Sequence, residues 1–564
     1  MVINIKNVFR PKLFTVFREG YTKKQLQSDL LAGIIVGIVA LPLAIAFAIA
    51  SGVSPEKGLI TAIVAGFLIS FLGGSRVQIG GPTGAFVVIV FGVVSQYGIE
   101  GLIVSTFLAG LMLIAFGVLR LGTIIEFIPH PLTVGFTSGI ALIIFSSQIK
   151  EFFGLSIADV PSGFIDKWGV YLSHLNTTNF YALGVAVGTV LIIVYSKRII
   201  KLIPGSFVAI IIMTIIPAIF KLPVNTIGSV FGDLPNTFEV NIPSINIANI
   251  RHYIAPAFTI ALLGAIESLL SAVVADGMIS GKHRSNTELI AQGIANVASS
   301  IFGGIPATGA IARTATNVKN GGRTPVAGVV HSITLLLIVL FFGKWAVQIP
   351  LACLAGILVV VAYNMSEWRS FLAILRGSRY DMVVLLTTFL LTVLVDLTVA
   401  IQIGMVLAAL LFMQRMSKAS EVIAVESDMD TLEDYSDLPK GVEIYEINGP
   451  FFFAASQKYR ETLKNFGKKA DVLILRMRNV PFIDSTGIHN FRETIKFLQA
   501  IDVKLILSGV RPEVRKELED NRIDFLIGRN NICGHYNEAK EKAIIAMEQI
   551  NMEIKERSKE TAYQ

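Results

Sequence analysis

Two short segments of the sequence share a Thr-Gly-Ala core, at residues 81–85 (Gly-Pro-Thr-Gly-Ala) and 306–310 (Pro-Ala-Thr-Gly-Ala). Each segment opens an unusually short apolar stretch. The first turn of a helix presents unpaired N–H groups and the positive end of the helix dipole, which together attract an anion without any charged side chain. We therefore predict two half-helices whose N-termini face one another and receive an anion.

The residue types at both half-helix starts suit such a site. Glycine and alanine let the backbone approach a ligand closely, and threonine hydroxyls donate hydrogen bonds. The candidate residues are Thr83, Gly84 and Ala85 in the first segment and Thr308, Gly309 and Ala310 in the second. The alternative is that both segments are helix-breaking turns at a packing interface, but the repetition of the motif favours binding.

Arg313 lies four residues after Gly309, about one turn into the second half-helix. A guanidinium there would add a fixed positive charge to an anion cavity. Ionisable residues inside membrane segments are functional candidates, because burying a charge is costly. The structural alternatives are an arginine that reaches the membrane surface or one that pairs with a buried carboxylate.

Glu267 stands in an otherwise apolar segment, 260–271, with Ser271 one turn later on the same helix face. A buried carboxylate can carry a proton or hold a cation such as sodium. We therefore predict that Glu267 acts in coupling or in assembling the site. The alternatives are a neutral, hydrogen-bonded core glutamate or an ion pair with Arg313.

The segments that must position these residues are those of a membrane protein. Of the 564 residues, 53% are hydrophobic and 16% are charged, and the mean hydropathy is +0.66. These values exclude an ordinary soluble globular protein. Within a predicted transmembrane domain, 29–415, fourteen apolar windows are expected to span the membrane: 30–52, 57–74, 82–97, 100–120, 130–150, 179–196, 204–220, 253–276, 287–304, 308–319, 325–343, 350–365, 381–396 and 398–414.

The charged residues between the windows indicate how the chain is oriented. Residues 1–28 are basic and are predicted to form a cytoplasmic amphipathic segment on the lipid surface. Loops on the same side are also basic, whereas Asp159, Asp166 and Asp233 lie on the other side, as the positive-inside rule expects. An even number of spans then places both termini in the cytoplasm and the protein in the cell membrane.

The two half-helices belong to an internal repeat. The offset of 225 residues between the two motifs also lays the first window, 31–52, over residues 256–277 of the eighth. With seven spans in each half, the second copy enters the membrane from the opposite side. Short, glycine-interrupted segments at corresponding positions of two halves are the best sequence indication of a transporter site.

Other function classes find no support in the sequence. The net charge of +7 is scattered over short loops, so no nucleic-acid partner is expected. The two cysteines, Cys353 and Cys533, form neither a disulfide framework nor a CxxC metal site. Phosphate-loop and metalloenzyme motifs are absent, so we expect no enzyme, no cofactor and no metal apart from a sodium ion at Glu267.

The composition changes after Arg415. The acidic segment 416–440 is predicted as a linker, 441–555 as a small α/β domain and 556–564 as a tail. Strands are expected at 442–447, 471–476 and 503–508.

In this domain, residues 484–487 (Asp-Ser-Thr-Gly) join a strand to a helix. Asp484 or Ser485 can cap that helix. A phosphate on Ser485 would lie at its positive end, so a regulatory phosphorylation site is an equal alternative.

These residues together resemble the SulP family of sulfate permeases and related anion exchangers. The resemblance is carried by 262–276, by Gly-Gly-Ile-Pro at 303–306, by Arg313-Thr314 and by Gly-Arg-Thr-Pro at 322–325. Residues 484–487 are similar to the corresponding loop of a STAS domain. The resemblance implies fourteen spans in two inverted seven-span repeats, a core and a gate domain, a homodimer and a cytoplasmic STAS domain.

The resemblance also implies where the substrate binds, namely between the third and tenth spans at Thr83–Phe86 and Thr308–Arg313. Residues 262–276 and 283–296 look similar to sodium-dependent bicarbonate transporters of the cyanobacterial type. That branch has aspartate where this chain has Glu267 and threonine where it has Ile311. The expected coupling site, formed by Glu267, Ser271, Gly309 and Ile311, is therefore compatible with sodium or with a proton. Ser485 matches the phosphorylated position of the antagonist proteins.

The function predicted from these features is secondary-active transport of a small inorganic oxyanion, sulfate or bicarbonate, with dicarboxylates also open. Transport would be coupled to sodium or protons and work by an elevator-like movement. Lipid, a second copy of the chain and a cytoplasmic partner of the STAS domain are the other expected partners. The alternatives are a nucleobase permease of the same architecture, an uncoupled anion channel and a membrane-bound signalling scaffold.

Overall fold

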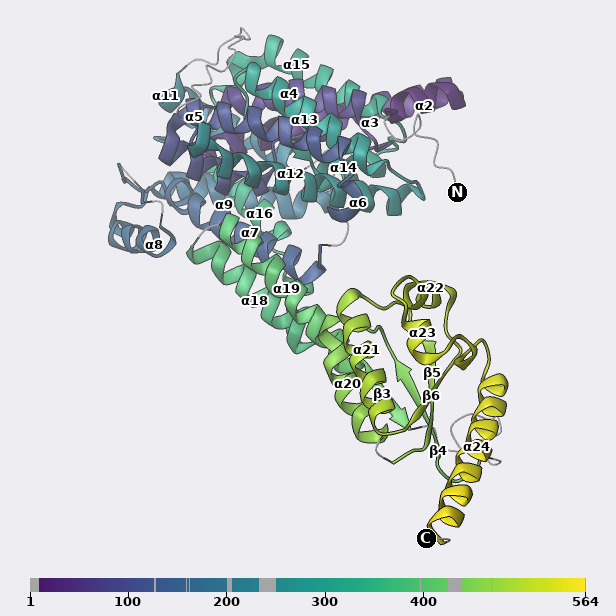
Figure 1. The fold of residues 1–564 in the computed structure, drawn as a ribbon. Helices are drawn as coiled ribbons and strands as arrows, with labels where there is room; N and C mark the ends of the chain where they lie inside the picture. Colours follow the sequence, from purple (N-terminus) through teal and green to yellow (C-terminus); the bar gives the residue numbers. More distant parts are fainter. Residues whose placement is uncertain are drawn as a thin grey trace. The chain divides into compact units, whose positions relative to one another are not determined.

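The structure is a computed structural model, and it describes residues 10–125, 128–158, 160–161, 163–199, 205–232, 250–395, 397–424, 438–467 and 469–562. The chain forms two compact units, Met1–Ala408 and Ala409–Gln564. Helices dominate the first unit, and the second contains a sheet (Figure 1). Asp159 and Asp233, used above to predict the orientation, lie outside the described residues.

Each of the fourteen predicted windows contains a helix. In the first half these are α3 (Lys23–Ala50), α4 (Pro55–Leu72), α5 (Gly84–Val118), α7 (His130–Phe153), α9 (Phe180–Ile199) and α10 (Gly205–Phe220). In the second half they are α12 (Ile250–Ile279), α13 (Ser285–Ile301), α14 (Ile311–Lys319), α15 (Val326–Ala346), α16 (Leu351–Met365), α18 (Arg379–Leu394) and α19 (Leu397–Ala419). The prediction of a polytopic helical membrane region is confirmed.

The helices differ from the predicted windows in one place. The windows 82–97 and 100–120 lie on a single element, α5, which is interrupted at Gly98 (φ 70°, ψ −174°). Glycine accommodates this positive φ without the steric cost of a Cβ. Within the described part of the chain, eight helices are long and apolar enough to cross a membrane on their own, and the nine-residue half-helix α14 is not among them.

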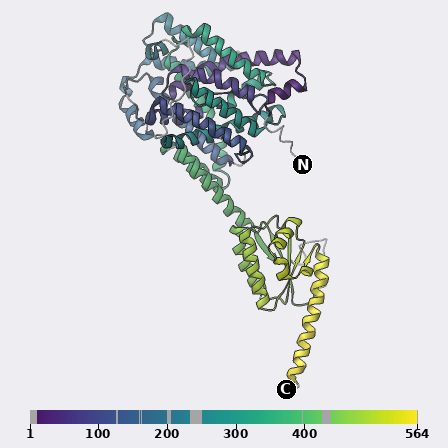
Figure 2. The same ribbon diagram turned by 45° about the horizontal axis from the view of Figure 1, so that its top comes forward.

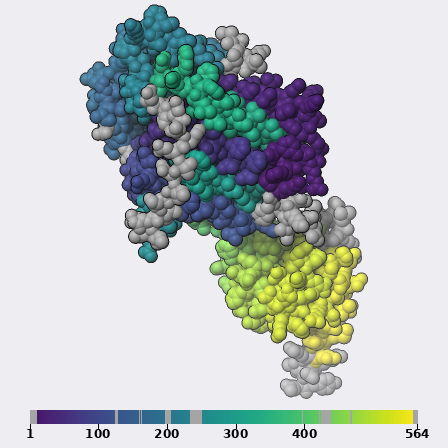
Figure 3. Space-filling model, turned by 90° about the horizontal axis from the view of Figure 1, so that it is seen from above, coloured from purple at the N-terminus to yellow at the C-terminus, as the bar shows by residue number. Residues whose placement is uncertain are grey.

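Two groups of helices pack among themselves. One contains α3, α4, α5 and α12 to α15, and the other contains α7, α9, α10, α16 and α18. These groups match the expected core and gate domains. Small residues allow close packing in the first group, since a Cβ on Gly110 of α5 would crowd the backbone of Gly293 in α13. Figure 3 shows the green-teal α15 lying against the purple N-terminal helices of the same group.

Short helices lie between the long ones. They are α2 (Lys12–Glu19), α6 (Gly122–Ile125), α8 (Phe164–Ser173), η1 (Leu175–Thr177), α11 (Ile227–Phe231) and α17 (Trp368–Leu375). Buried Asp29 of α3 holds the loop before α15, because its carboxylate accepts hydrogen bonds from the Arg323 N–H at 2.8 Å and the Thr324 N–H at 3.2 Å. The Thr324 hydroxyl also donates to this carboxylate, at 2.5 Å, so the threonine of the Gly-Arg-Thr-Pro sequence has a structural role.

The second unit is an α/β domain built on a five-stranded sheet. The strand order is β3 (Glu421–Ala424), β4 (Val442–Asn448), β5 (Val472–Asn479), β6 (Lys504–Ser508) and β7 (Ile532–Cys533). The pairs from β4 to β7 are parallel, and β3 runs antiparallel to β4. The three strands predicted from the sequence are confirmed.

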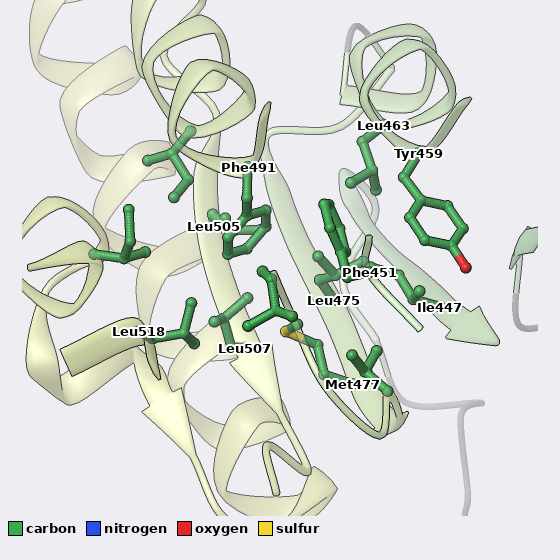
Figure 4. Packing of buried hydrophobic residues seen from close by; sticks show 14 of the residues in the cluster. Ile447, Phe451, Tyr459, Leu463, Leu475, Met477, Phe491, Leu505, Leu507 and Leu518 are labelled. Atoms are coloured by element: carbon green, nitrogen blue, oxygen red, sulfur yellow. The ribbon is translucent and has the colours of Figure 1, made fainter. Parts of the chain in front are cut away.

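Helices cover both faces of this sheet (Figure 2). One face carries α20 (Phe453–Gly467), α21 (Ser485–Ala500), α22 (Pro512–Asp520) and α23 (Ile523–Ile527), and the turn η2 (Arg529–Asn531) precedes β7. The other face packs against α24 (Tyr536–Ala562). Phe451, Phe491 and Leu475 are fully buried on the first face (Figure 4). Their burial removes aromatic and aliphatic surface from water and stabilises the domain.

The segment predicted as a linker, 416–440, contains the end of α19 and the strand β3. The acidic composition of this segment gave no indication of a strand. The four-residue edge strand β3 is stabilised by its pairing with β4 and not by a local sequence pattern. The segment predicted as a tail, 556–564, begins inside α24.

Candidate functional site between two half-helices

The two predicted half-helices meet through a two-residue sheet. β1 (Gly80–Gly81) pairs antiparallel with β2 (Thr308–Gly309), and the Ala310 N–H donates to the Ile79 carbonyl at 2.8 Å. α5 and α14 begin directly after these strands, at Gly84 and Ile311. The antiparallel pairing brings the two copies of the repeat together in opposite directions.

Neither half-helix start is capped by its own side chain. Thr83 is the N-cap residue of α5 and Ala310 that of α14, and neither side chain accepts a hydrogen bond from the first turn. The N–H groups of both first turns therefore have no side-chain cap. Together with the helix dipoles, they create a positive potential at the crossing.

The crossing is too tight for larger residues. A Cβ on Gly309 would collide with the amide nitrogen of Gln78, and one on Gly81 (φ 146°) would collide with the guanidinium of Arg313. Gln78 is itself fixed, because it donates to the hydroxyl of Ser268 at 3.0 Å. At both positions an added Cβ would displace a side chain that is held at the crossing, and at Gly81 the positive φ also favours glycine.

Side chains of α14 bind the segment that leads into β1. The Thr314 hydroxyl accepts a hydrogen bond from the Ile79 N–H at 3.0 Å, and the Asn317 amide donates to the Val77 carbonyl at 2.8 Å. The second half-helix is thus attached to the approach of the first by side-chain as well as backbone contacts.

Arg313 is buried at the same crossing, with 2% of its surface exposed. Its guanidinium donates to the carbonyls of Gly80 and Pro82, directly before α5. The alternative of an arginine at the membrane surface is therefore wrong. Arg313 and Glu267 are both described residues and form no ion pair with each other, so that alternative also fails. Arg313 places a positive charge beside the start of the other half-helix.

A cavity of about 290 Å³ opens between the half-helices. The predicted site residues that line it are Thr83, Gly84, Ala85, Glu267, Gly309, Ala310, Ile311 and Arg313. Ile311 is 42% exposed and offers no oxygen ligand. The structure thus brings together residues that lie up to 230 positions apart in the sequence.

Three predicted site residues do not line this cavity. Phe86 is buried and packs beside Gly264. The Thr308 hydroxyl donates to the Gly264 carbonyl at 3.0 Å, and the Ser271 hydroxyl lies 3.3 Å from that of Thr314. Their side chains pack outside the cavity and hold the residues that line it.

Glu267 reaches the N-terminus of α5. The Thr83 hydroxyl donates to its carboxylate at 2.9 Å. This contact uses the Thr83 hydroxyl, so that group is not a free donor to an anion in this arrangement. Glu267 and Arg313 then provide charges of opposite sign on the same cavity, without cancelling each other in an ion pair.

Sequence reasoning missed some residues of the site. The cavity is also lined by Leu43 and Phe47 of α3, Thr137 of α7, Asn364 and Met365 at the end of α16, and Glu367 just before α17. No periodic pattern distinguishes these residues from ordinary packing positions.

Glu288 was also missed. It is fully buried, and its carboxylate accepts hydrogen bonds from the Gly74 N–H (2.8 Å) and from Gln292 (2.9 Å). The sequence could have indicated this residue, because Glu288 is, like Glu267, a carboxylate inside a predicted span.

In the α/β unit, Asp484 is the N-cap of α21. Its carboxylate accepts hydrogen bonds from the Gly487 N–H at 2.7 Å and the Phe453 N–H at 2.9 Å. Of the two predicted capping residues, Asp484 therefore fills the role. Ser485 is exposed at the first position of the helix.

Comparison with known proteins identifies both units. Residues 26–388 match the model of the sulfate permease family, and residues 437–539 match the STAS domain. The chain is 42% identical to a putative sulfate transporter, YvdB, of Bacillus subtilis, over 92% of this chain and 98% of that protein. It is 30% identical to the bicarbonate transporter BicA of Picosynechococcus sp., over 93% of this chain and 96% of that protein.

The fold is similar to that of a solved anion transporter. The murine Slc26a9 structure, in its inward-facing state, superposes with a TM-score of 0.85 at 19% sequence identity and covers 97% of this chain and 96% of that one. The relatives are named as transporters, and none of these names describes an enzyme. The chain therefore belongs to the sulfate permease family, as a multi-pass membrane transporter with a C-terminal STAS domain.

Proposed function

We propose that this protein is a secondary-active transporter of small inorganic oxyanions, sulfate or bicarbonate. The observation that carries the proposal is the single cavity onto which two half-helix starts and the Arg313 guanidinium open. The names of the relatives, a putative sulfate transporter and a bicarbonate transporter, support the same class of substrate.

The anion would bind at the two first turns. Thr83–Phe86 and Thr308–Arg313 would form this site, with Gly84, Ala85, Gly309 and Ala310 nearest to the ligand. The first residues of both helices line the cavity, so their N–H groups would meet the anion with little reorganisation. Arg313 would act through its charge and through the N–H donors that are not used by the carbonyls of Gly80 and Pro82. This arrangement suits any small oxyanion of fitting size.

Glu267 would couple the anion to a cation. An ionised carboxylate on the cavity repels an anion, and a proton or a sodium ion at Glu267 removes that repulsion. The cation and the anion would then favour each other's binding. Gly309 and Ile311 would border this coupling site, and Ser271 would support it through Thr314.

Movement of one helix group past the other would give alternating access. Both half-helices belong to the group formed by α3 to α5 and α12 to α15. The opposite wall of the cavity comes from the second group, through Thr137 of α7 and Asn364 of α16. An elevator-like displacement would carry the half-helices with their anion along this wall.

Orientation and assembly belong to the same proposal. We place both termini in the cytoplasm of the cell and expect a homodimer in the cell membrane, with the STAS domain available to a cytoplasmic partner and Ser485 available to a kinase. Labelling of single cysteines from either side of the membrane tests the orientation. Native mass spectrometry of the detergent-solubilised protein tests the dimer.

The decisive experiment is an uptake panel. The purified full chain in liposomes receives labelled sulfate or bicarbonate, under a sodium gradient and a proton gradient applied separately. We expect accumulation of at least one oxyanion above equilibrium under one gradient. If no oxyanion moves under either gradient while the protein remains folded, the proposal is wrong. Steady movement without any gradient dependence would identify an uncoupled channel.

A further inference from the structure

A second, larger cavity lies beside the half-helix cavity. Its volume is about 490 Å³. It begins one turn further along α3 and α5, at Ala50 and Val87, and about two turns earlier on α12, at Thr259. The three helices thus lead from one cavity to the other. The second cavity lies at the end of α3 that is remote from the N-terminus.

A buried lysine lines this cavity. Lys167 of α8 is only 6% exposed, and its Nζ lies 5.4 Å from the centre of the Phe91 ring. Lysine is almost never buried without a partner. Lys167 has no carboxylate partner among the described residues, and the contact with the aromatic ring compensates only partly for the lost water.

Lys167 lies on the buried face of α8, which it shares with the fully buried Tyr171 and the partly buried Trp168. Ile165 is 73% exposed and Leu172 is 63% exposed, whereas Lys167 between them is turned inward. Asp166, the neighbouring acidic residue, is exposed. A charged group on a buried helix face is costly unless a partner compensates for the lost water. The inward lysine is therefore placed for a ligand of negative charge.

We propose that this cavity is a second anion site, in which Lys167 binds a small inorganic oxyanion on its way to or from the half-helices. The inference rests on the proposed function, since it supplies the access route for the same substrate. Lys167 is the one charged side chain among the described lining residues, and the hydroxyl of Ser147 and the amide of Gln96 lie on the same cavity. An anion that enters would pair with a cation that is already desolvated, and could leave again toward α5.

The first test is transport by Lys167→Gln in phosphatidylcholine vesicles. We expect the KM for labelled sulfate or bicarbonate to rise at least about fivefold, with the maximal rate within about twofold of wild type. Lys167→Arg should restore the KM, and the matched control Asp166→Asn should leave it unchanged. An unchanged KM in Lys167→Gln would overturn the proposal. An effect seen only after phosphatidylglycerol is added would assign the cavity to a lipid headgroup, which also overturns it.

The second test does not depend on transport. Ser147→Cys is made in a chain with Cys353 and Cys533 replaced by alanine, and is treated with an anionic sulfonate-bearing thiosulfonate reagent or its cationic ammonium analogue. Lys167→Gln should lower the ratio of anionic to cationic labelling at least about fivefold. An unchanged ratio would show that Lys167 does not attract anions. If the wild-type protein transports nothing while the Ser147→Cys chain shows the fall in labelling ratio on Lys167→Gln, the proposed function alone is contradicted.

A final arm concerns Asp396, which follows the lining residue Val395 and lies outside the described residues. If Lys167 served only to neutralise Asp396, the double variant Lys167→Gln/Asp396→Asn would regain the wild-type KM and labelling ratio. That outcome would overturn the proposal. We expect the double variant to keep the defect of Lys167→Gln.

Discussion

The starts of α5 and α14 in the membrane unit contrast with the start of α21 in the STAS unit. All three helices follow a short strand or bridge, and all three present N–H groups at the positive end of a dipole. At α21 the carboxylate of Asp484 accepts a hydrogen bond from one of them, the Gly487 N–H. At α5 and α14 no side-chain cap does so. The same local geometry thus carries a side-chain cap where it stabilises a fold, and lacks one where we propose that it binds a substrate.

The contrast can be tested by adding a side-chain cap to one of the uncapped helix starts. Ala310→Asp would give α14 its own carboxylate cap and place a negative charge on the cavity. Two like charges about 4 Å apart cost about 4 kcal/mol at an effective dielectric constant of about 20. We expect the anion affinity to fall at least about a hundredfold, measured as the Kd for sulfate or bicarbonate or as the KM for uptake.

Ala310→Ser is the matched control. Its hydroxyl can cap the same N–H groups without adding charge, so its defect should be smaller than that of Ala310→Asp. Equal affinity in Ala310→Asp and wild type would exclude the start of α14 from the anion site.

Removal of the positive charge tests the same cavity from the other direction. Arg313→Ala deletes a buried cation and leaves the carbonyls of Gly80 and Pro82 without their partner. Truncation of a buried charged group costs about 2–5 kcal/mol, so the anion affinity should fall by about a hundredfold. The measurement is equilibrium binding of the labelled anion to purified protein.

A second arginine offers a control for this variant. Arg323 also donates to main-chain carbonyls, those of Val318 and Gly322, but lines neither cavity, so Arg323→Ala should leave equilibrium anion binding within about twofold of wild type. Retained affinity in Arg313→Ala, with a normal unfolding temperature, would remove the arginine from the site.

Glu267 distinguishes a coupled transporter from a passive one. Glu267→Gln retains an oxygen that can accept the Thr83 hydrogen bond but cannot carry a proton or a full negative charge. Under a tenfold gradient of the coupled ion, wild type with one ion per anion should accumulate the anion about tenfold. We expect Glu267→Gln to reach equal concentrations on both sides and to stop there.

Glu267→Asp is the conservative variant, because it keeps a carboxylate at this position. It should retain gradient-driven accumulation, with a changed KM. Full accumulation by Glu267→Gln would show that coupling occurs elsewhere.

The smallest effect is expected at the closed helix start. Asp484→Ala removes the cap of α21, which costs about 1 kcal/mol. Hydrogen exchange of the first turn of α21 in the full-length protein should become about fivefold faster. Asp484→Asn retains a capping oxygen and should be close to wild type. Unchanged protection in Asp484→Ala would mean that other contacts hold this turn.

Much of the architecture was predictable because it depends on local patterns. Apolar windows predict helices, because about 20 apolar residues are needed to span a membrane. The repeated Thr-Gly-Ala motif indicated both half-helices. The strands of the STAS unit followed from short apolar runs. Edge strand β3 was not predictable, since its pairing with β4 depends on residues more than twenty positions away.

The contacts inside the site were less predictable. That Arg313 would bind the Gly80 and Pro82 carbonyls depends on the register between two strands that are far apart in the sequence. The same holds for Thr83, whose hydroxyl is used by Glu267, and for Lys167, whose cavity is lined by residues from several distant helices. Residue type identified which side chains were costly to bury, but only the packed structure identified their neighbours.

The two-residue sheet between the repeats has a genetic consequence. Its joint is made by main-chain atoms, which no side-chain exchange can delete. A collection of loss-of-function alleles should therefore contain few hits from lost polar groups in β1 and β2 and more at Gly81 and Gly309, where an added Cβ displaces the side chain of Arg313 or of Gln78. Charged residues elsewhere in the two repeats can differ while this main-chain pairing is kept.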